Sequence, residues 1–148
     1  DDNNSMSEML IQALKIVVTA VITVVVTIAV ILFFKWRRKG KLASLRRMKP
    51  NILLVKMVDM LHLGGYLKEY KGTESDFPEK LSELVEELSV SDIAYFVNLA
   101  NKAAFGNKPI EKDEKRTAYN HYVRTAEFVY GKLNFIKKVY FKYLKVYY

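Results

Sequence analysis

Residues 16–34 constrain the fold most, because nineteen consecutive residues there carry no charge. At about 1.5 Å of rise per residue, a helix of this length approaches the ~30 Å hydrocarbon core of a bilayer. Fourteen of the sixteen residues from 16 to 31 are β-branched, which by propensity alone favours a strand. A lone segment in lipid, however, can satisfy its backbone N–H and C=O groups only as a helix. We therefore predict one transmembrane helix over residues 10–34, in contact with the lipid bilayer.

The charges that flank this span predict its orientation. Residues 1–14 carry three acidic side chains and no Lys or Arg, whereas residues 35–49 carry eight basic side chains and no acid. The positive-inside rule then places the N-terminus outside the cell membrane and the C-terminus in the cytoplasm. A secretory signal peptide would carry its basic residues before the apolar run, not after it. We expect the inner membrane interface to be occupied by Lys35, Trp36, Arg37, Arg38, Lys39 and Lys41.

Composition divides the chain into four parts. These are an extracytoplasmic linker (1–9), the transmembrane helix (10–34), a basic juxtamembrane connector (35–50) and a cytoplasmic helical domain (51–148). The net charge of +8 equals that of the juxtamembrane cluster alone, which favours a topology signal and attraction to anionic lipid over nucleic-acid binding. The chain has no cysteine, so disulfides and cysteine metal sites are excluded.

The cytoplasmic part shows helical periodicity and no sustained strand-like alternation, which predicts an all-α bundle of about four or five helices. A first helix is expected to begin at Pro50 and to end at the Gly64–Gly65 pair. Its predicted core face contains the apolar residues at positions 52, 55, 58, 61 and 63. A second helix is expected to begin near Thr73 or Ser75, either of which can cap it.

The third and last helices have their own boundary signals. Ser89 or Ser91 is expected to cap the third helix, with Asp92 behind it, and Gly106 to end it. The segment from Pro109 to the C-terminus is expected to be helical and to break near Gly131 or Asn134. The predicted buried face of the third helix consists of Ile93, Phe96, Val97, Ala100, Ala104 and Phe105.

The polar residues form no catalytic or metal-binding constellation in sequence. His62 and His121 are far apart, and we expect each to be a surface or capping histidine, because a metal site needs three or four ligands. Glu83, Glu86 and Glu87 are expected to form a solvated helix face. We therefore nominate no catalytic, cofactor-binding or metal-binding residue and expect no cofactor.

Thr19, Thr23 and Thr27 recur every four residues on one face of the predicted span. Each hydroxyl can bond the carbonyl four residues back, which is harmless in lipid. Alternatively, the three residues form a small-residue stripe that packs on another transmembrane helix.

The C-terminal run is rich in both aromatic and basic residues, and three interpretations remain open. The aromatic residues can form the core of the domain, residues 132–148 can lie on the inner leaflet, or they can dock a partner. Tyr147 and Tyr148, at the very end, are expected to be hard to bury, which keeps the second interpretation open. Lipid binding would then use Lys132, Lys137, Lys138, Lys142 and Lys145.

Two short motifs, GYLKEYKGTESDF and ANKAAFG, together with the span, the basic connector and the tyrosine-rich end, resemble a known family. Residues 10–148 resemble the C-terminal region of bacterial membrane-anchored transglutaminase-like proteins, an uncharacterised domain that follows their last span. The familiar Thr-Pro pair of that region is replaced here by Thr73-Glu74. The resemblance implies that the enzymatic domain, with its Cys-His-Asp triad, precedes the last span and is not in this chain. The matching structural motif residues are Thr73, Asp76, Phe77, Ala104, Phe105 and Gly106.

These observations predict a non-catalytic membrane anchor with a cytoplasmic helical interaction domain that can contact a cytoplasmic protein. The chain begins with Asp rather than Met, which is consistent with the C-terminal part of a longer transglutaminase-like protein or with a trimmed chain. The alternative is a stand-alone single-span protein whose basic-aromatic domain binds anionic lipid or a soluble partner.

Overall fold

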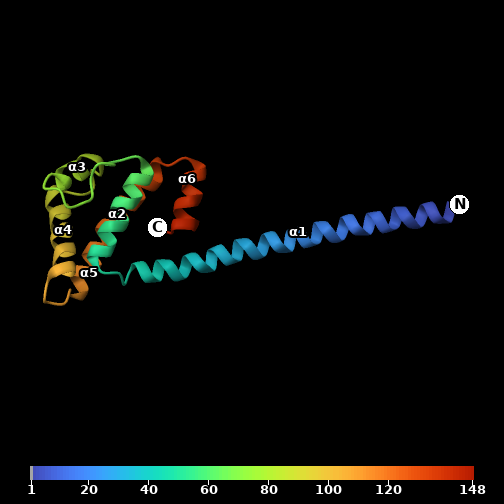
Figure 1. Cartoon of the computed structure of the whole chain (residues 1–148), viewed down its shortest axis with the longest axis horizontal. Coiled ribbons are helices and arrows are strands. Elements are labelled where there is room, and N and C mark those ends of the chain that lie inside the picture. Colours follow the sequence, from blue (N-terminus) through green and yellow to red (C-terminus); the bar gives the residue numbers. More distant parts are fainter. Residues whose placement is uncertain (1) are drawn as a thin grey trace. The chain divides into compact units, whose positions relative to one another are not determined.

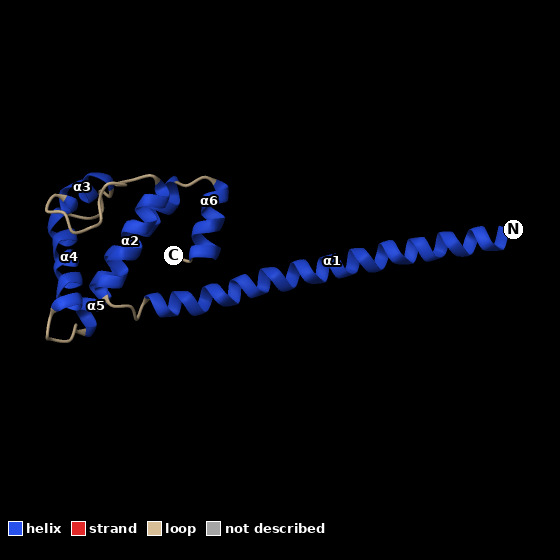
Figure 2. Cartoon of the chain, viewed as in Figure 1, coloured by secondary structure: helices blue, strands red, loops and turns tan. Residues whose placement is uncertain are grey.

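The structure is a computed structural model that describes residues 2–148, with side chains described from residue 6 onward. It divides into two compact units, Asp1–Arg37 and Arg38–Tyr148 (Figure 1). The described residues form helices joined by turns and contain no strand (Figure 2). The all-α prediction is therefore confirmed, and residue 1 of the predicted linker lies outside the described residues.

Helix α1 (Asp2–Leu45) is longer than the predicted span at both ends. Residues of the predicted linker and most of the predicted basic connector continue the same helix. Lys, Arg, Leu and Ala in residues 35–45 are good helix formers. The helix continues through Gly40, and no neighbouring atom lies within 4 Å of the position that a Cβ would occupy there. The connector thus becomes irregular only after Leu45, in the turn that precedes Pro50. Within unit 1 the apolar side chains of the predicted span are exposed, except that of Phe34, which is partly buried.

Helix α2 (Pro50–Gly64) begins and ends where predicted, with Pro50 in its first turn and Gly65 in the left-handed conformation (φ 91°) just after it. Its predicted core face is wrong in part, because Ile52 and Val55 are exposed. Apolar residues occupy nearly every position of this helix, so periodicity allows more than one face. Packing against α4 and α5 selects the face that contains Leu53, Leu54, Met57, Val58, Met60 and Leu61.

Helix α3 (Phe77–Leu84) begins later than predicted, and neither Thr73 nor Ser75 caps it. Asp76 precedes the helix without a capping hydrogen bond and instead accepts one from the Tyr70 hydroxyl at 2.8 Å. That hydrogen bond raises the pKa of Tyr70 to about 12. Thr73 is exposed, whereas Phe77 is fully buried.

The Glu74 carboxylate organises the turn before α3. It accepts hydrogen bonds from the backbone N–H groups of Lys71, Gly72 and Thr73 at 2.9–3.0 Å. These hydrogen bonds lower the pKa of Glu74, and the one from the Lys71 N–H has the largest effect. Glu74 therefore stabilises the loop before α3 rather than the first turn of that helix, which explains why α3 begins later than predicted.

Helix α4 (Val90–Phe105) begins as predicted, with a capping box between Ser89 and Asp92, and Gly106 follows its last residue. Ile93, Phe96 and Ala100 are buried as expected. Phe105, however, is 85% exposed, and Ala104 is exposed as well, so both are corrections to the predicted face. Phe105 follows Phe96 by nine residues, which is two and a half turns, and therefore lies on the opposite side of the helix.

The last predicted segment breaks into two helices, as the glycine and asparagine signals suggested, and ends in a π-helical turn that the sequence did not predict. Helix α5 (Lys112–Lys132) starts at a capping box between Glu111 and Glu114, and α6 (Phe135–Val139) starts after Asn134. The π-helical turn η1 (Tyr140–Lys145) continues directly from α6. Helices α2, α4 and α5 pack on one another and α3 packs on α4, so one core serves the whole of unit 2 (Figure 1).

Candidate membrane-binding surface

The C-terminal segment, defined as residues 134–148, has one side in the core and one side in solvent. Asn134 starts it by accepting a hydrogen bond from the Lys137 backbone N–H at 2.9 Å. On the core side Phe141 is fully buried, and its ring centroid lies 5.9 Å from that of Tyr130 and 4.9 Å from that of Tyr147. Val146 and Tyr147 are also buried, whereas Tyr148 is partly buried, so the prediction that the terminal tyrosines are hard to bury is wrong for Tyr147.

Hydrogen bonds from three tyrosine hydroxyl groups hold the end of this segment in place. The buried Tyr122 hydroxyl donates to the Tyr147 carbonyl at 2.7 Å, and the Tyr147 hydroxyl donates to Asp59 at 2.9 Å. The Tyr148 hydroxyl donates to Glu127, also at 2.9 Å. Burial raises the pKa of both Tyr122 and Tyr147, so these hydroxyls keep their protons and remain donors at neutral pH.

Arg38 connects the C-terminus to the juxtamembrane part of the chain. Its guanidinium Nη2 donates to the Tyr148 carbonyl at 3.1 Å. Arg38 is itself a residue of unit 2, so this hydrogen bond holds the C-terminus within that unit.

The solvent side of the segment is apolar at its start. Phe135 is 81% exposed and Ile136 is 78% exposed, and three further residues are partly exposed: Val139, Tyr140 and Leu144. Lysines border these residues. Lys138 and Lys142 lie over the Tyr130 ring, 5.4 and 5.7 Å from its centroid. An exposed apolar patch bordered by lysines is typical of a segment that binds at a lipid–water interface.

The other lysines predicted for lipid binding are exposed. Lys145 lies 4.0 Å from Asp59, and Lys137 donates to the Leu63 carbonyl at 3.4 Å. Such solvent-exposed contacts contribute little and leave the ammonium groups able to reach a second anion. Lys132 lines a separate hollow.

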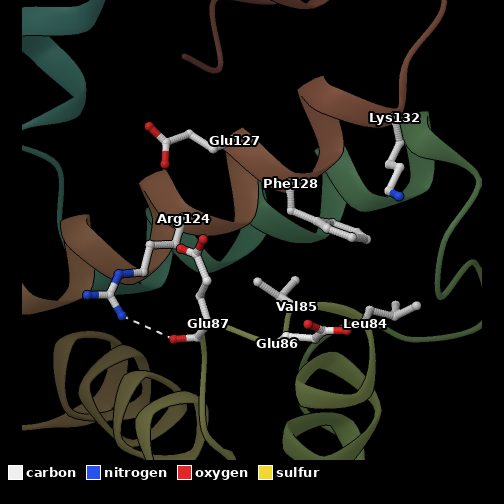
Figure 3. Close-up of a pocket in the computed structure, with 8 residues that line it drawn as sticks. All are labelled: Leu84, Val85, Glu86, Glu87, Arg124, Glu127, Phe128 and Lys132. Atoms are coloured by element: carbon white, nitrogen blue, oxygen red, sulfur yellow. Dashed lines mark hydrogen bonds between the residues drawn. The ribbon is translucent and has the colours of Figure 1, made fainter.

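That hollow lies beside α5 and has a volume of about 510 Å³. Figure 3 shows Phe128 of α5 and Val85 of the turn after α3 facing each other across it. Arg124 donates to the Glu87 carbonyl at 3.1 Å. The lining of the hollow contains charges of both signs and no Ser, Cys or His, so it presents no nucleophile–base pair. The lining residues are Leu84, Val85, Glu86, Glu87, Arg124, Glu127, Phe128 and Lys132.

The predicted interface residues lie on α1 near the boundary of the two units. Trp36 is 75% exposed, Lys35, Lys39 and Lys41 are exposed, and Arg37 and Arg38 are partly buried. In the predicted span, the hydroxyls of Thr19, Thr23 and Thr27 each donate to the carbonyl four residues back at 2.8 Å. Each hydroxyl is thus satisfied within α1. Packing of this stripe on another helix remains a prediction.

The two histidines have different environments. His62 is partly buried, and its Nε2 lies 2.9 Å from the carbonyls of both Leu67 and Tyr70, so it links α2 to the turn that follows rather than capping a helix. His121 is buried beside Phe96, which corrects the surface assignment, and burial lowers its pKa. Among the described residues, no group of three or more His, Cys, Asp or Glu side chains could hold a metal ion.

No protein-family model, curated protein or solved structure matches this chain. The resemblance to transglutaminase-like proteins therefore stays a prediction. Its motif residues have separate structural roles. Phe77 is a core residue, Asp76 binds Tyr70 and Gly106 follows α4, whereas Thr73, Ala104 and Phe105 are exposed.

Proposed function

We propose that this chain is a non-catalytic membrane anchor with a helical interaction domain, oriented with its N-terminus outside and its C-terminus in the cytoplasm. One observation supports the anchor most strongly. Among the described residues, α1 is the one helix long and apolar enough to cross a membrane, with a mean hydropathy of 3.1 over its most apolar window and none of that window buried. A core helix of a soluble protein would be covered by other elements, so the exposed apolar surface of this helix favours a lipid environment.

Orientation can be tested by labelling single cysteines, because the chain has none of its own. We expect Ser7→Cys to react with a membrane-impermeant maleimide on intact cells. Asn107→Cys, in the exposed loop after α4, should react only after permeabilisation. The reverse pattern would refute the orientation, and release of the full chain by alkaline carbonate would refute the anchor itself.

A second function is favoured by the chemistry of the C-terminal segment. Its exposed side presents Phe135 and Ile136 among lysines, and Arg38 holds its end. In this proposal the C-terminal segment binds the anionic inner leaflet, with the Phe135 ring in the interfacial region and the lysines at the headgroups. The domain would then present α3 and α4 to soluble partners.

Two exposed phenylalanines provide a matched test. In a Trp36→Phe background, Phe135→Trp should show blue-shifted emission and quenching by brominated lipid when the full chain is in nanodiscs containing phosphatidylserine. Phe105→Trp, whose parent ring is equally exposed, should keep solvent-like emission. Charge reversal at Lys137 and Lys138 should remove the difference. Identical emission from the two tryptophans would refute contact between the segment and the leaflet.

The relationship to transglutaminase-like proteins is part of the same proposal and is supported by the residues of the two motifs. In it, an extracytoplasmic enzymatic domain precedes the span and this chain anchors that domain. An antibody against the last six residues, applied to native membranes, should detect a band far above 17 kDa. A band near 17 kDa would refute the longer parent and favour the stand-alone lipid- or partner-binding protein.

A further inference from the structure

A second hollow of unit 2, with a volume of about 610 Å³, gathers five cationic side chains from two distant parts of the chain. Two come from the turn that joins α1 to α2, and three come from the first turns of α5. They are Arg46, Arg47, Lys112, Lys115 and Arg116. Sequence separates the two groups by more than sixty residues, so only the fold brings them together.

The acidic residues nearby do not neutralise this cluster. Asp113 is the one carboxylate in the lining, and it lies 3.5 Å from Arg116 with both side chains largely exposed to water. Such a pair contributes little. Glu114 is engaged elsewhere, because it accepts from Lys102 at 2.7 Å and from the Glu111 backbone N–H at 2.8 Å. Five cations and one carboxylate leave four positive charges in the lining.

The position of the cluster makes the excess charge unfavourable in the free protein. Lys112, Lys115 and Arg116 lie at the start of a 21-residue helix, where the positive end of the helix dipole opposes further cations. An anion in the hollow would relieve both the mutual repulsion and the unfavourable interaction with the dipole. The capping box of Glu111 and Glu114 already occupies backbone N–H groups at this helix end, so the anion would be held mainly by side chains.

We propose that this hollow binds the phosphate groups of a small anion that carries at least two phosphomonoesters or a triphosphate chain. A phosphomonoester carries about −1.5 to −2 charges at pH 7, so two of them match the four positive charges of the lining. Arg46 and Arg47 can each bind phosphate oxygens with a planar fork of donors. The Tyr119 hydroxyl and the Asn120 amide, also in the lining, supply neutral hydrogen bonds. The volume is within the range of small-molecule sites.

The binding test uses the full chain in phosphatidylcholine nanodiscs and sodium tripolyphosphate as the probe, with affinity measured by calorimetry at fixed ionic strength. We expect saturable binding at one site. The double variant Arg47→Glu/Lys115→Glu should weaken it by at least about tenfold, as expected for lost charge-assisted hydrogen bonds. Lys137→Glu/Lys138→Glu makes the same change in net charge outside this hollow and should leave the affinity nearly unchanged.

Folding of the variants is checked in the same samples. Arg47 is exposed, Lys115 is only partly buried and the reversal lowers repulsion among the cations, so the variant should keep its thermal midpoint without probe. It should lose only the shift that tripolyphosphate produces. The neutral pair Arg47→Gln/Lys115→Gln should give an intermediate affinity. Equal weakening by the hollow and control variants, or no saturable binding to the wild-type chain, would overturn the proposal.

A soluble metabolite or a lipid headgroup can deliver the same phosphate chemistry, and a second comparison distinguishes them. Phosphatidylinositol bisphosphate carries two phosphomonoesters, as the proposed anion does, whereas phosphatidylglycerol carries only a diester. If phosphatidylinositol bisphosphate in the nanodisc competes with tripolyphosphate more strongly than phosphatidylglycerol does, the natural anion is a lipid headgroup. If it competes no more strongly, the natural anion is soluble. This site does not depend on leaflet binding by the C-terminal segment, which the tryptophan experiment tests separately.

Discussion

Replacement of Phe141 by alanine should remove the main side chain that holds the C-terminal segment to the core. Its ring is fully buried and contacts the Tyr130 and Tyr147 rings at 5.9 and 4.9 Å between centroids. Deleting a buried phenylalanine side chain costs about 3–5 kcal/mol, from lost transfer free energy and the cavity left behind. For a domain of about a hundred residues, each kcal/mol lowers the thermal midpoint by at least about 4 °C. We therefore expect the midpoint to fall by at least about 12 °C.

The measurement is thermal unfolding of the full chain in neutral detergent, followed by near-ultraviolet circular dichroism of the tyrosines. Phe135→Ala is the matched control, since its ring lies six residues earlier and is 81% exposed. It should change stability by less than about 0.5 kcal/mol. Phe141→Leu, which keeps most of the apolar volume, should fall between the two. Similar small effects for Phe141→Ala and Phe135→Ala would refute the docking of the C-terminal segment against the core.

Three further outcomes follow from single interactions in the same domain. Tyr122→Phe leaves the buried Tyr147 carbonyl without its 2.7 Å donor and should lower the free energy of unfolding by about 1–3 kcal/mol, measured by denaturant titration. Ser89→Ala removes the capping box with Asp92 and should cost about 1 kcal/mol in the same titration. Ser82→Ala is the control, because that hydroxyl donates to the Glu79 carbonyl within α3 and caps no helix. Burial lowers the pKa of His121 below its usual 6.5, so the unfolded chain binds the proton more readily than the folded chain does. The free energy of unfolding should therefore fall as the pH drops from 7 to 5, and His121→Gln should flatten this dependence on pH. An unchanged slope in that variant would assign the pH dependence to other groups.

The boundaries of several helices were predictable because local chemistry determines them. Pro50, Gly65 and the Ser89–Asp92 pair act on backbone groups within one turn of the chain, and each has the expected role. The start of α3 was mispredicted because Glu74 accepts three N–H groups of the preceding turn instead of stabilising a helix start. Two local structures competed there, and the sequence motif was compatible with both.

The faces of the helices were harder to predict than their ends. In α2 the apolar residues nearly surround the helix, so only packing against α4 and α5 decides that Met57 is buried while Val55 is 67% exposed. Phe105 was expected on the buried face of α4 as part of its apolar set, but it lies half a turn away from the buried side of that helix. Hydrophobicity therefore identified the helices, whereas their neighbours decided which side of each is buried.

The sequence by itself determined the all-helical class, the long apolar segment and the charge asymmetry around it, because each depends on composition or short-range order. Only the tertiary structure decided where the charged and aromatic residues meet. It brought Arg46 and Arg47 to the first turns of α5, and it buried Tyr147 while leaving Phe135 exposed. Contacts between residues far apart in sequence depend on how helix faces pack, and that information is spread over the whole core rather than held in any one motif.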